Sequence, residues 1–148
     1  MAEKMTLTQV REKAAALQNA ANEIAGFRTN NLGRISEDER DRLLTEERNI
    51  RRQVRQVENE ALDIIWDDLQ TALKEMREAT DKMRVVRAHL TSVRRALSFA
   101  GAVLGLGVSI VSGNVIAVGA ASLEVVNLVN GFREEDDAEA EAEEEAVG

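Results

Sequence analysis

The amino-acid sequence predicts an all-α, elongated protein. The 148-residue chain contains no Pro and no Cys, and only 3% of its residues are aromatic, which is a poor composition for a β-sandwich or a barrel. Neither Gly nor Pro interrupts residues 34–100, and apolar residues recur there at spacings of three and four, as on one face of a helix. We therefore expect a helical hairpin or coiled coil with one very long helix, followed by a Gly-rich apolar helical hairpin and a disordered acidic tail.

Residues 1–35 are expected to form an N-terminal amphipathic helix and a loop. Thr6 and Gln9 make a capping box, in which each side chain bonds the other residue's backbone amide at the helix start. The stretch Arg28–Gly33 has the composition of a loop and ends the helix. The polar N-terminus lacks the apolar segment of a cleavable signal peptide. The apolar stripe of this helix comprises Leu7, Val10, Ala14, Leu17, Ala21 and Ile24.

Residues 36–97 are expected to form the long helix. Ser36 and Glu39 make a second capping box, and a helix from there to residue 97 would be about 90 Å long. Its apolar stripe changes register within 61–66, where apolar residues surround the helix and Trp66 is expected to anchor a core or an interface. The stripe predicts a heptad seam that consists of Leu62, Ile65, Leu69, Met76, Met83, Val86, Leu90 and Val93.

The N-terminal helix is too short to cover this seam. Its roughly 20 residues span about 30 Å, a third of the length of the long helix. The rest of the seam must meet the C-terminal segment or another copy of the protein, so we expect a homo-oligomer that assembles through the seam.

Residues 98–132 are expected to form an apolar, Gly-rich hairpin that enters a lipid membrane. A run of 28 uncharged residues extends from Ala96 to Leu123, which is long enough for a membrane-spanning candidate. Basic residues before such a run are typical of headgroup anchors, and the expected headgroup-binding residues are Arg84, Arg87, Arg94 and Arg95. The expected membrane-inserting residues are Phe99, Val103, Leu104, Leu106, Val108, Ile110, Val111, Val115, Ile116 and Val118.

Two geometries remain open for this segment. The sequence Ser112-Gly113-Asn114 is a turn signal and predicts two antiparallel arms of about 22 Å each. A single continuous span would instead place small residues at every fourth position, forming a ridge that lets helices approach closely. The turn signal favours the hairpin. The close-packing residues of the ridge are Gly101, Gly105, Ser109 and Gly113.

The order of these segments resembles that of α-helical pore-forming proteins, in which a long charged helix and an arginine pair precede an apolar hairpin. The stretch from Arg94–Ser98 through Ser109–Gly113 is also similar in style to the membrane-addressing hairpin of the apolipoproteins L. The resemblance implies membrane insertion and pore formation. This chain departs from it in having one long helix before the hairpin and an acidic tail after it.

Residues 133–148 form the acidic tail. Nine of the 27 acidic residues lie in 134–145, so the other 18 stand against 19 basic residues in the body of the protein. A low-complexity segment of acidic residues and Ala is expected to be disordered, and it is suited to a basic surface on a partner. Because the body has no basic domain, no nucleic-acid partner is expected.

The composition argues against an enzyme. With one His and no Cys, no nucleophile–base pair can be assembled, and neither a metal nor a cofactor is expected. The favoured function is membrane insertion by an oligomer, as a pore, an anchor or a remodelling protein, with a membrane-associated location. The alternative is a soluble homo-oligomeric structural, adaptor or virion assembly protein, cytoplasmic or in a virion, whose apolar hairpin is buried between subunits.

Overall fold

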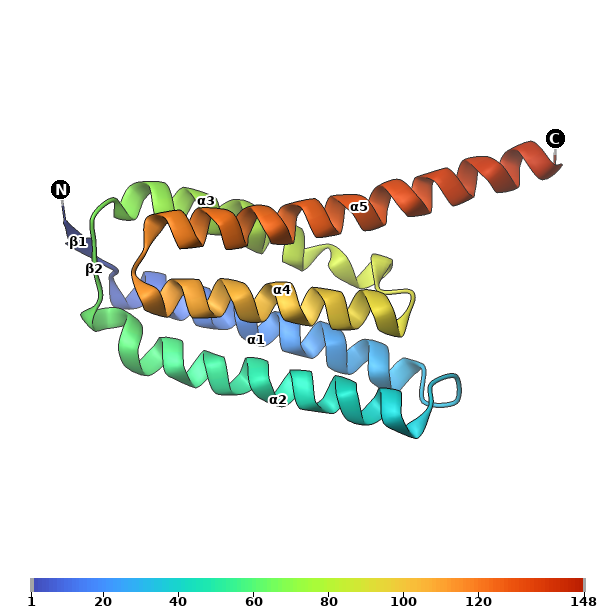
Figure 1. The fold of residues 1–148 in the computed structure, drawn as a ribbon, viewed down its shortest axis with the longest axis horizontal. Coiled ribbons are helices and arrows are strands. Elements are labelled where there is room, and N and C mark those ends of the chain that lie inside the picture. The colour runs from blue at the N-terminus through green and yellow to red at the C-terminus, as the bar shows by residue number, and fades with distance from the viewer. Residues whose placement is uncertain (1, 148) are drawn as a thin grey trace.

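Five α-helices packed as a bundle make up most of the fold. The computed structural model describes residues 2–147, and it confirms the prediction of an all-α protein. Figure 1 shows that successive helices run in opposite directions along the long axis, with α1 and α3 behind α4 and α5. The five helices are α1 (Leu7–Asn30), α2 (Glu37–Glu60), α3 (Leu69–Arg84), α4 (Val93–Ser112) and α5 (Val115–Val147).

Both predicted capping boxes are present at the starts of α1 and α2. The amide of Gln9 donates to the Thr6 hydroxyl at 3.1 Å, and the amide of Thr6 donates to the Gln9 side-chain oxygen at 2.9 Å. Ser36 and Glu39 repeat the arrangement at the same two distances. These bonds satisfy amides that have no partner inside the helix, which fixes where each helix begins.

The single long helix predicted over residues 36–97 is wrong, because the chain breaks twice in that range. The first break contains the 3₁₀ turn η1 (Ala61–Asp63) and the strand β2 (Ile65–Trp66), which pairs antiparallel with β1 (Glu3–Lys4). The second break contains the 3₁₀ turn η2 (Val86–His89). Neither break needs Gly or Pro.

Side-chain caps and burial explain the two breaks. The side chains of Asp68 and Ser92 accept the amide hydrogens of Thr71 and Arg95, both at 3.2 Å, and so start α3 and α4. Trp66 is fully buried in the core, which a straight helix with apolar residues on every side could not achieve at the surface of a bundle. Folding the segments back on one another buries their apolar stripes, and this burial contributes more than helix continuity.

The predicted heptad seam lies mostly inside the bundle. Ile65 is exposed, Leu62 and Val93 are half-buried, and the other five seam residues belong to the core. The chain's own helices therefore cover the seam that was expected to join separate copies. The buried seam residues are Leu69, Met76, Met83, Val86 and Leu90.

The acidic tail is helical and not disordered as predicted. It continues α5 as far as Val147 and projects beyond the bundle, as Figure 1 shows in red. Starting a helix is the unfavourable step, and here the packed part of α5 has already formed the first turns. The tail then needs only to extend an existing helix with Ala and Glu, which both favour that conformation.

Candidate membrane-contacting surface

The predicted apolar hairpin is present, and the alternative of one continuous span is wrong. Helix α4 ends at Gly113, whose φ of 69° is the left-handed conformation that glycine adopts without strain. Asn114 then starts α5, since its side-chain oxygen accepts the amide hydrogens of Ile116 at 2.9 Å and Ala117 at 3.2 Å. The turn therefore falls at the predicted residues.

The hairpin has an inner and an outer face. Its inner face belongs to the core of the bundle and contains half of the predicted membrane-inserting residues: Phe99, Val103, Leu106, Ile110 and Val118. Leu104, Val111 and Val115 are half-buried beside it. Among the predicted residues, only Val108 and Ile116 are exposed, with 58% and 80% of their surface accessible to solvent. The folded bundle thus holds most of the predicted insertion residues away from any membrane.

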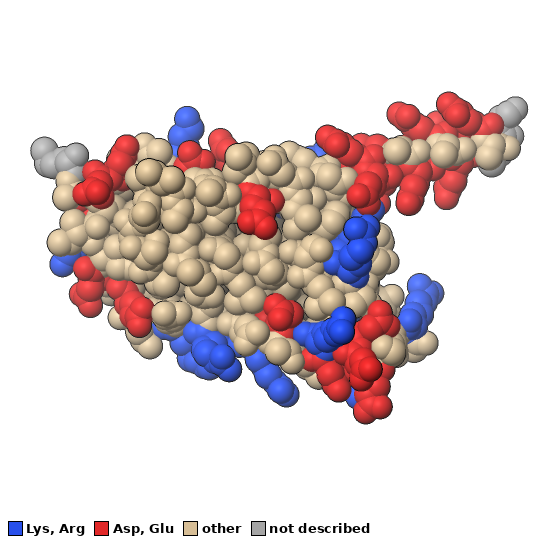
Figure 2. Space-filling view, viewed as in Figure 1, with Lys and Arg blue, Asp and Glu red and all other residues tan. Residues whose placement is uncertain are grey.

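The outer face carries almost no charge. From Ala96 to Phe132 the only charged residue is Glu124, and Figure 2 shows a broad surface over α4 and α5 that one acidic group interrupts. The uncharged part of α4 is about 26 Å long at the usual rise per residue. We define the outer face by its exposed helical residues: Ser98, Gly101, Gly105, Val108, Ser112, Ile116, Ala120, Leu123, Glu124 and Asn127.

The four predicted close-packing residues do not form one ridge in the bundle. Gly101 and Gly105 lie on the outer face, where an added Cβ atom would meet nothing within 4 Å. Ser109 is buried and donates to the carbonyl of Leu106 at 2.6 Å, and Gly113 forms the turn. Gly101 and Gly105 therefore lack a packing role in this fold, although each destabilises a helix by about 1 kcal/mol relative to Ala.

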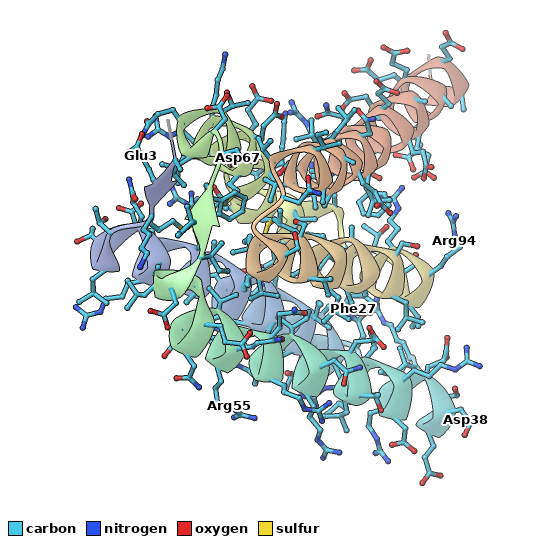
Figure 3. The ribbon with its side chains drawn as sticks, turned by 60° about the vertical axis from the view of Figure 1, so that its left-hand side comes forward. Glu3, Phe27, Asp38, Arg55, Asp67 and Arg94 are labelled. Atoms are coloured by element: carbon cyan, nitrogen blue, oxygen red, sulfur yellow. The ribbon has the colours of Figure 1, made fainter. Side chains whose placement is uncertain are left out.

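The predicted headgroup arginines are spread over three elements. Arg84 is exposed near the end of α3, and Arg87 in η2 pairs with Glu23 at 3.5 Å. Arg94 is exposed at the start of α4, and Figure 3 shows its side chain pointing away from the bundle. The structure does not bring the four together as a collar. Arg133, which the sequence reasoning missed, is exposed at the same end of the hairpin as Arg94, and its only signal was its place as the first base after the uncharged run.

Arg95 is the centre of a polar cluster that we call the latch. Its guanidinium donates to Glu135 at 2.8 Å, to Asp136 at 2.9 Å and to the carbonyl of His89 at 2.9 Å, and it lies 5.0 Å from the centre of the Phe132 ring. His89 also bonds Asp136 through its Nδ1 atom. The hydrogen bond from His89, reinforced by Arg95, lowers the pKa of Asp136. The latch joins η2 and the start of α4 to the acidic part of α5.

No match was found to any family model, curated protein or solved structure. By length and composition, α4 (Val93–Ser112) and the segment Val115–Ala146 are each apolar enough to cross a membrane. More than half of the apolar window of α4 is buried in the bundle. Among the described residues, no three His, Asp or Glu side chains converge as a metal site.

Proposed function

We propose that this is a non-enzymatic, membrane-associated protein that binds a lipid bilayer through the outer face and then inserts the α4–α5 hairpin. One observation supports the proposal above all others. A surface helix needs an apolar stripe only on the side that faces the core, yet α4 is uncharged on its outer side as well, from Ala96 to Ser112. Such a helix is suited to an apolar environment on all sides.

A comparison with α2 in the same bundle sharpens this argument. The exposed residues of α2 are almost all polar or charged and include Asp41, Arg48, Arg52 and Arg55. Those of α4 after Arg94 are only Ser, Gly and Val. The contrast is specific to the hairpin, because both helices are exposed to the same solvent.

The geometry supports an order of events. Val108, Ile116 and Leu123 can enter the interface of the bilayer while the bundle is still closed, with Arg94 and Arg133 placed at the level of the headgroups. Deeper insertion requires the hairpin to leave the bundle, after which lipid replaces α1, α2 and α3 as the surroundings of its inner face. Gly101 and Gly105 would then allow close helix approach within the membrane.

Flotation of the protein with liposomes of anionic and of neutral lipid, at low and high salt, tests this proposal. We expect recovery with the lipid even at high salt, because apolar contact is not screened by ions. Val108→Asp places a charge in the outer face, which near the centre of a bilayer costs about 2.5–3.5 kcal/mol, a loss of roughly 100-fold in partitioning. Leu32→Asp is the matched control, since Leu32 is 52% exposed in the loop between α1 and α2, and it should float like the original protein.

The second candidate is a soluble homo-oligomer that buries the outer face between subunits. Gly101 and Gly105 favour it, because their open surroundings would let a helix of another copy approach closely. Protein that stays in the soluble fraction at every salt concentration would contradict membrane binding. If sedimentation then showed an oligomer that Val108→Asp dissociates, the outer face would be a subunit interface.

A further inference from the structure

A groove runs between α1 and α3, behind the hairpin in the view of Figure 1. One part of the groove has a volume of about 240 Å³ and is lined by four apolar side chains, Ala15, Ala16, Ala20 and Met83, together with polar ones at its margins. The adjoining part, nearer the start of both helices, contains three cations: Lys13, Arg77 and Arg84. The two parts share Ala16, Thr80 and Arg84, so an apolar and a cationic region are continuous.

Lys13 is the unusual residue of this groove. Only 8% of its surface is exposed, and lysines are almost never buried to this degree without a partner. No ion pair within 4.0 Å and no side-chain hydrogen bond involves Lys13 in the part of the chain that the structure describes. Burial, reinforced by Arg77 and opposed by Glu12, lowers the pKa of Lys13.

The surroundings of Lys13 carry a net positive charge. Arg77 and Arg84 lie on the same face of α3, one to two turns apart, and neither forms an ion pair within 4.0 Å among the described residues. Glu12 and Asp81 line the same region but leave three cations against two acids. An oxyanion would supply the partner that the protein does not give to Lys13.

We propose that this groove binds a small amphiphile, with an anionic phosphate or carboxylate headgroup at Lys13, Arg77 and Arg84 and a short apolar chain along Ala16, Ala20 and Met83. The alanines leave room where larger side chains would fill the groove, and Met83 adapts its shape to an apolar ligand. This inference does not rest on the proposed membrane function, because no residue of the outer face lines the groove.

Calorimetric titration with octyl phosphate, inorganic phosphate and octyl glucoside, each below its micelle-forming concentration, tests the proposal. We expect octyl phosphate to bind at least about tenfold more tightly than either of the others, because only it contacts both parts of the groove. Equal binding of octyl glucoside would overturn the role of the cations. Equal binding of inorganic phosphate would overturn the role of the apolar part.

Lys13→Met distinguishes a binding residue from a structural one. The variant keeps the length and apolar stem of the side chain but removes a buried charge that lacks a partner, so thermal stability should stay the same or rise. Affinity for octyl phosphate should fall by roughly tenfold or more. Lys74→Met, at an exposed position of α3, removes the same charge and should change neither property. A destabilised Lys13→Met protein with unchanged affinity would show that Lys13 serves the fold and would overturn the proposal.

Val108→Asp provides a further control. It should bind octyl phosphate like the original protein, since Val108 lies on the outer face and outside the groove. A parallel loss of ligand binding and liposome flotation in this variant would show that the ligand acts on the hairpin, and would contradict a separate site.

Discussion

Arg95 shows how one side chain can change its meaning once its neighbours are known. Only 5% of it is exposed, and a guanidinium buried to that extent is tolerable because two carboxylates, a carbonyl and an aromatic ring surround it. The partners Glu135 and Asp136 come from the acidic segment, forty residues further along the chain. The latch therefore withdraws Arg95 from any headgroup while the bundle is closed.

Asp136→Asn should destabilise the bundle by about 1–3 kcal/mol, because it removes the charged partner of both Arg95 and His89 while leaving Arg95 buried. Urea unfolding measures the change. Asp137→Asn is the matched control, since Asp137 is the exposed neighbour and its loss removes the same charge. Equal destabilisation by both variants would mean that net charge, and not the latch, sets the difference.

The contribution of Asp136 to stability should depend on pH in a defined direction. Its pKa is lowered in the folded protein, chiefly by the hydrogen bond from His89. A carboxylate with a lowered folded pKa stabilises the protein fully above its unfolded pKa, near 3.8, and loses this effect as the pH falls through the lower folded value. The difference between the original protein and Asp136→Asn should therefore shrink as the pH falls below about 4. A difference that is constant across this range would contradict the assignment.

Among the elements, the projecting part of α5 is held by the weakest balance of forces. Beyond the latch its exposed acids repeat at a spacing of four residues, as in the pairs Asp137–Glu141, Glu139–Glu143 and Glu141–Glu145, and like charges at this spacing cost about 0.2–0.5 kcal/mol each. Acids in the last turn also oppose the helix dipole. Helix propensity and the packed start of α5 work against this repulsion.

Salt should strengthen this part of α5. Raising the salt concentration to about 1 M screens the repulsion between exposed acids, so the helical carbon chemical shifts of residues 137–146 should increase. Glu141→Gln removes two of the repulsive pairs and should give higher helicity at low salt with a smaller response to salt. A decrease of helicity with salt would mean that attraction, and not repulsion, governs this segment.

The elements differ in how far local sequence determines them. The capping boxes at Thr6 and Ser36 and the turn at Gly113 were predictable, because each depends on residues within four positions of one another. The breaks around Trp66 and before Ser92 were not, because Asp68 and Ser92 act as caps only when tertiary burial makes a break favourable. The sequence also contained every residue of the latch and the groove, but their partners lie on other helices.

At the scale of the whole molecule, the bundle and the membrane compete for the same apolar surface. The inner face of the hairpin completes the core, with Phe99 and Val103 fully buried, while the outer face is already exposed. Binding at the interface and insertion are therefore separate steps, and only the second requires the hairpin to leave α1, α2 and α3. This separation can be tested by holding α4 in place.

A disulfide between α2 and α4 should block insertion without blocking adsorption. A Cβ atom at Gly107 would lie 2.6 Å from Cγ of Gln53, so the double variant Gln53→Cys/Gly107→Cys replaces an overlap with two short side chains near bonding distance. The chain has no other cysteine. The oxidised protein should float with liposomes but release no entrapped dye, and reduction should restore release. Gln53→Cys alone is the control and should respond to neither treatment. Equal dye release by the oxidised and reduced double variant would show that the bilayer is breached with α4 still packed in the bundle, and that the outer face acts without separation of the hairpin.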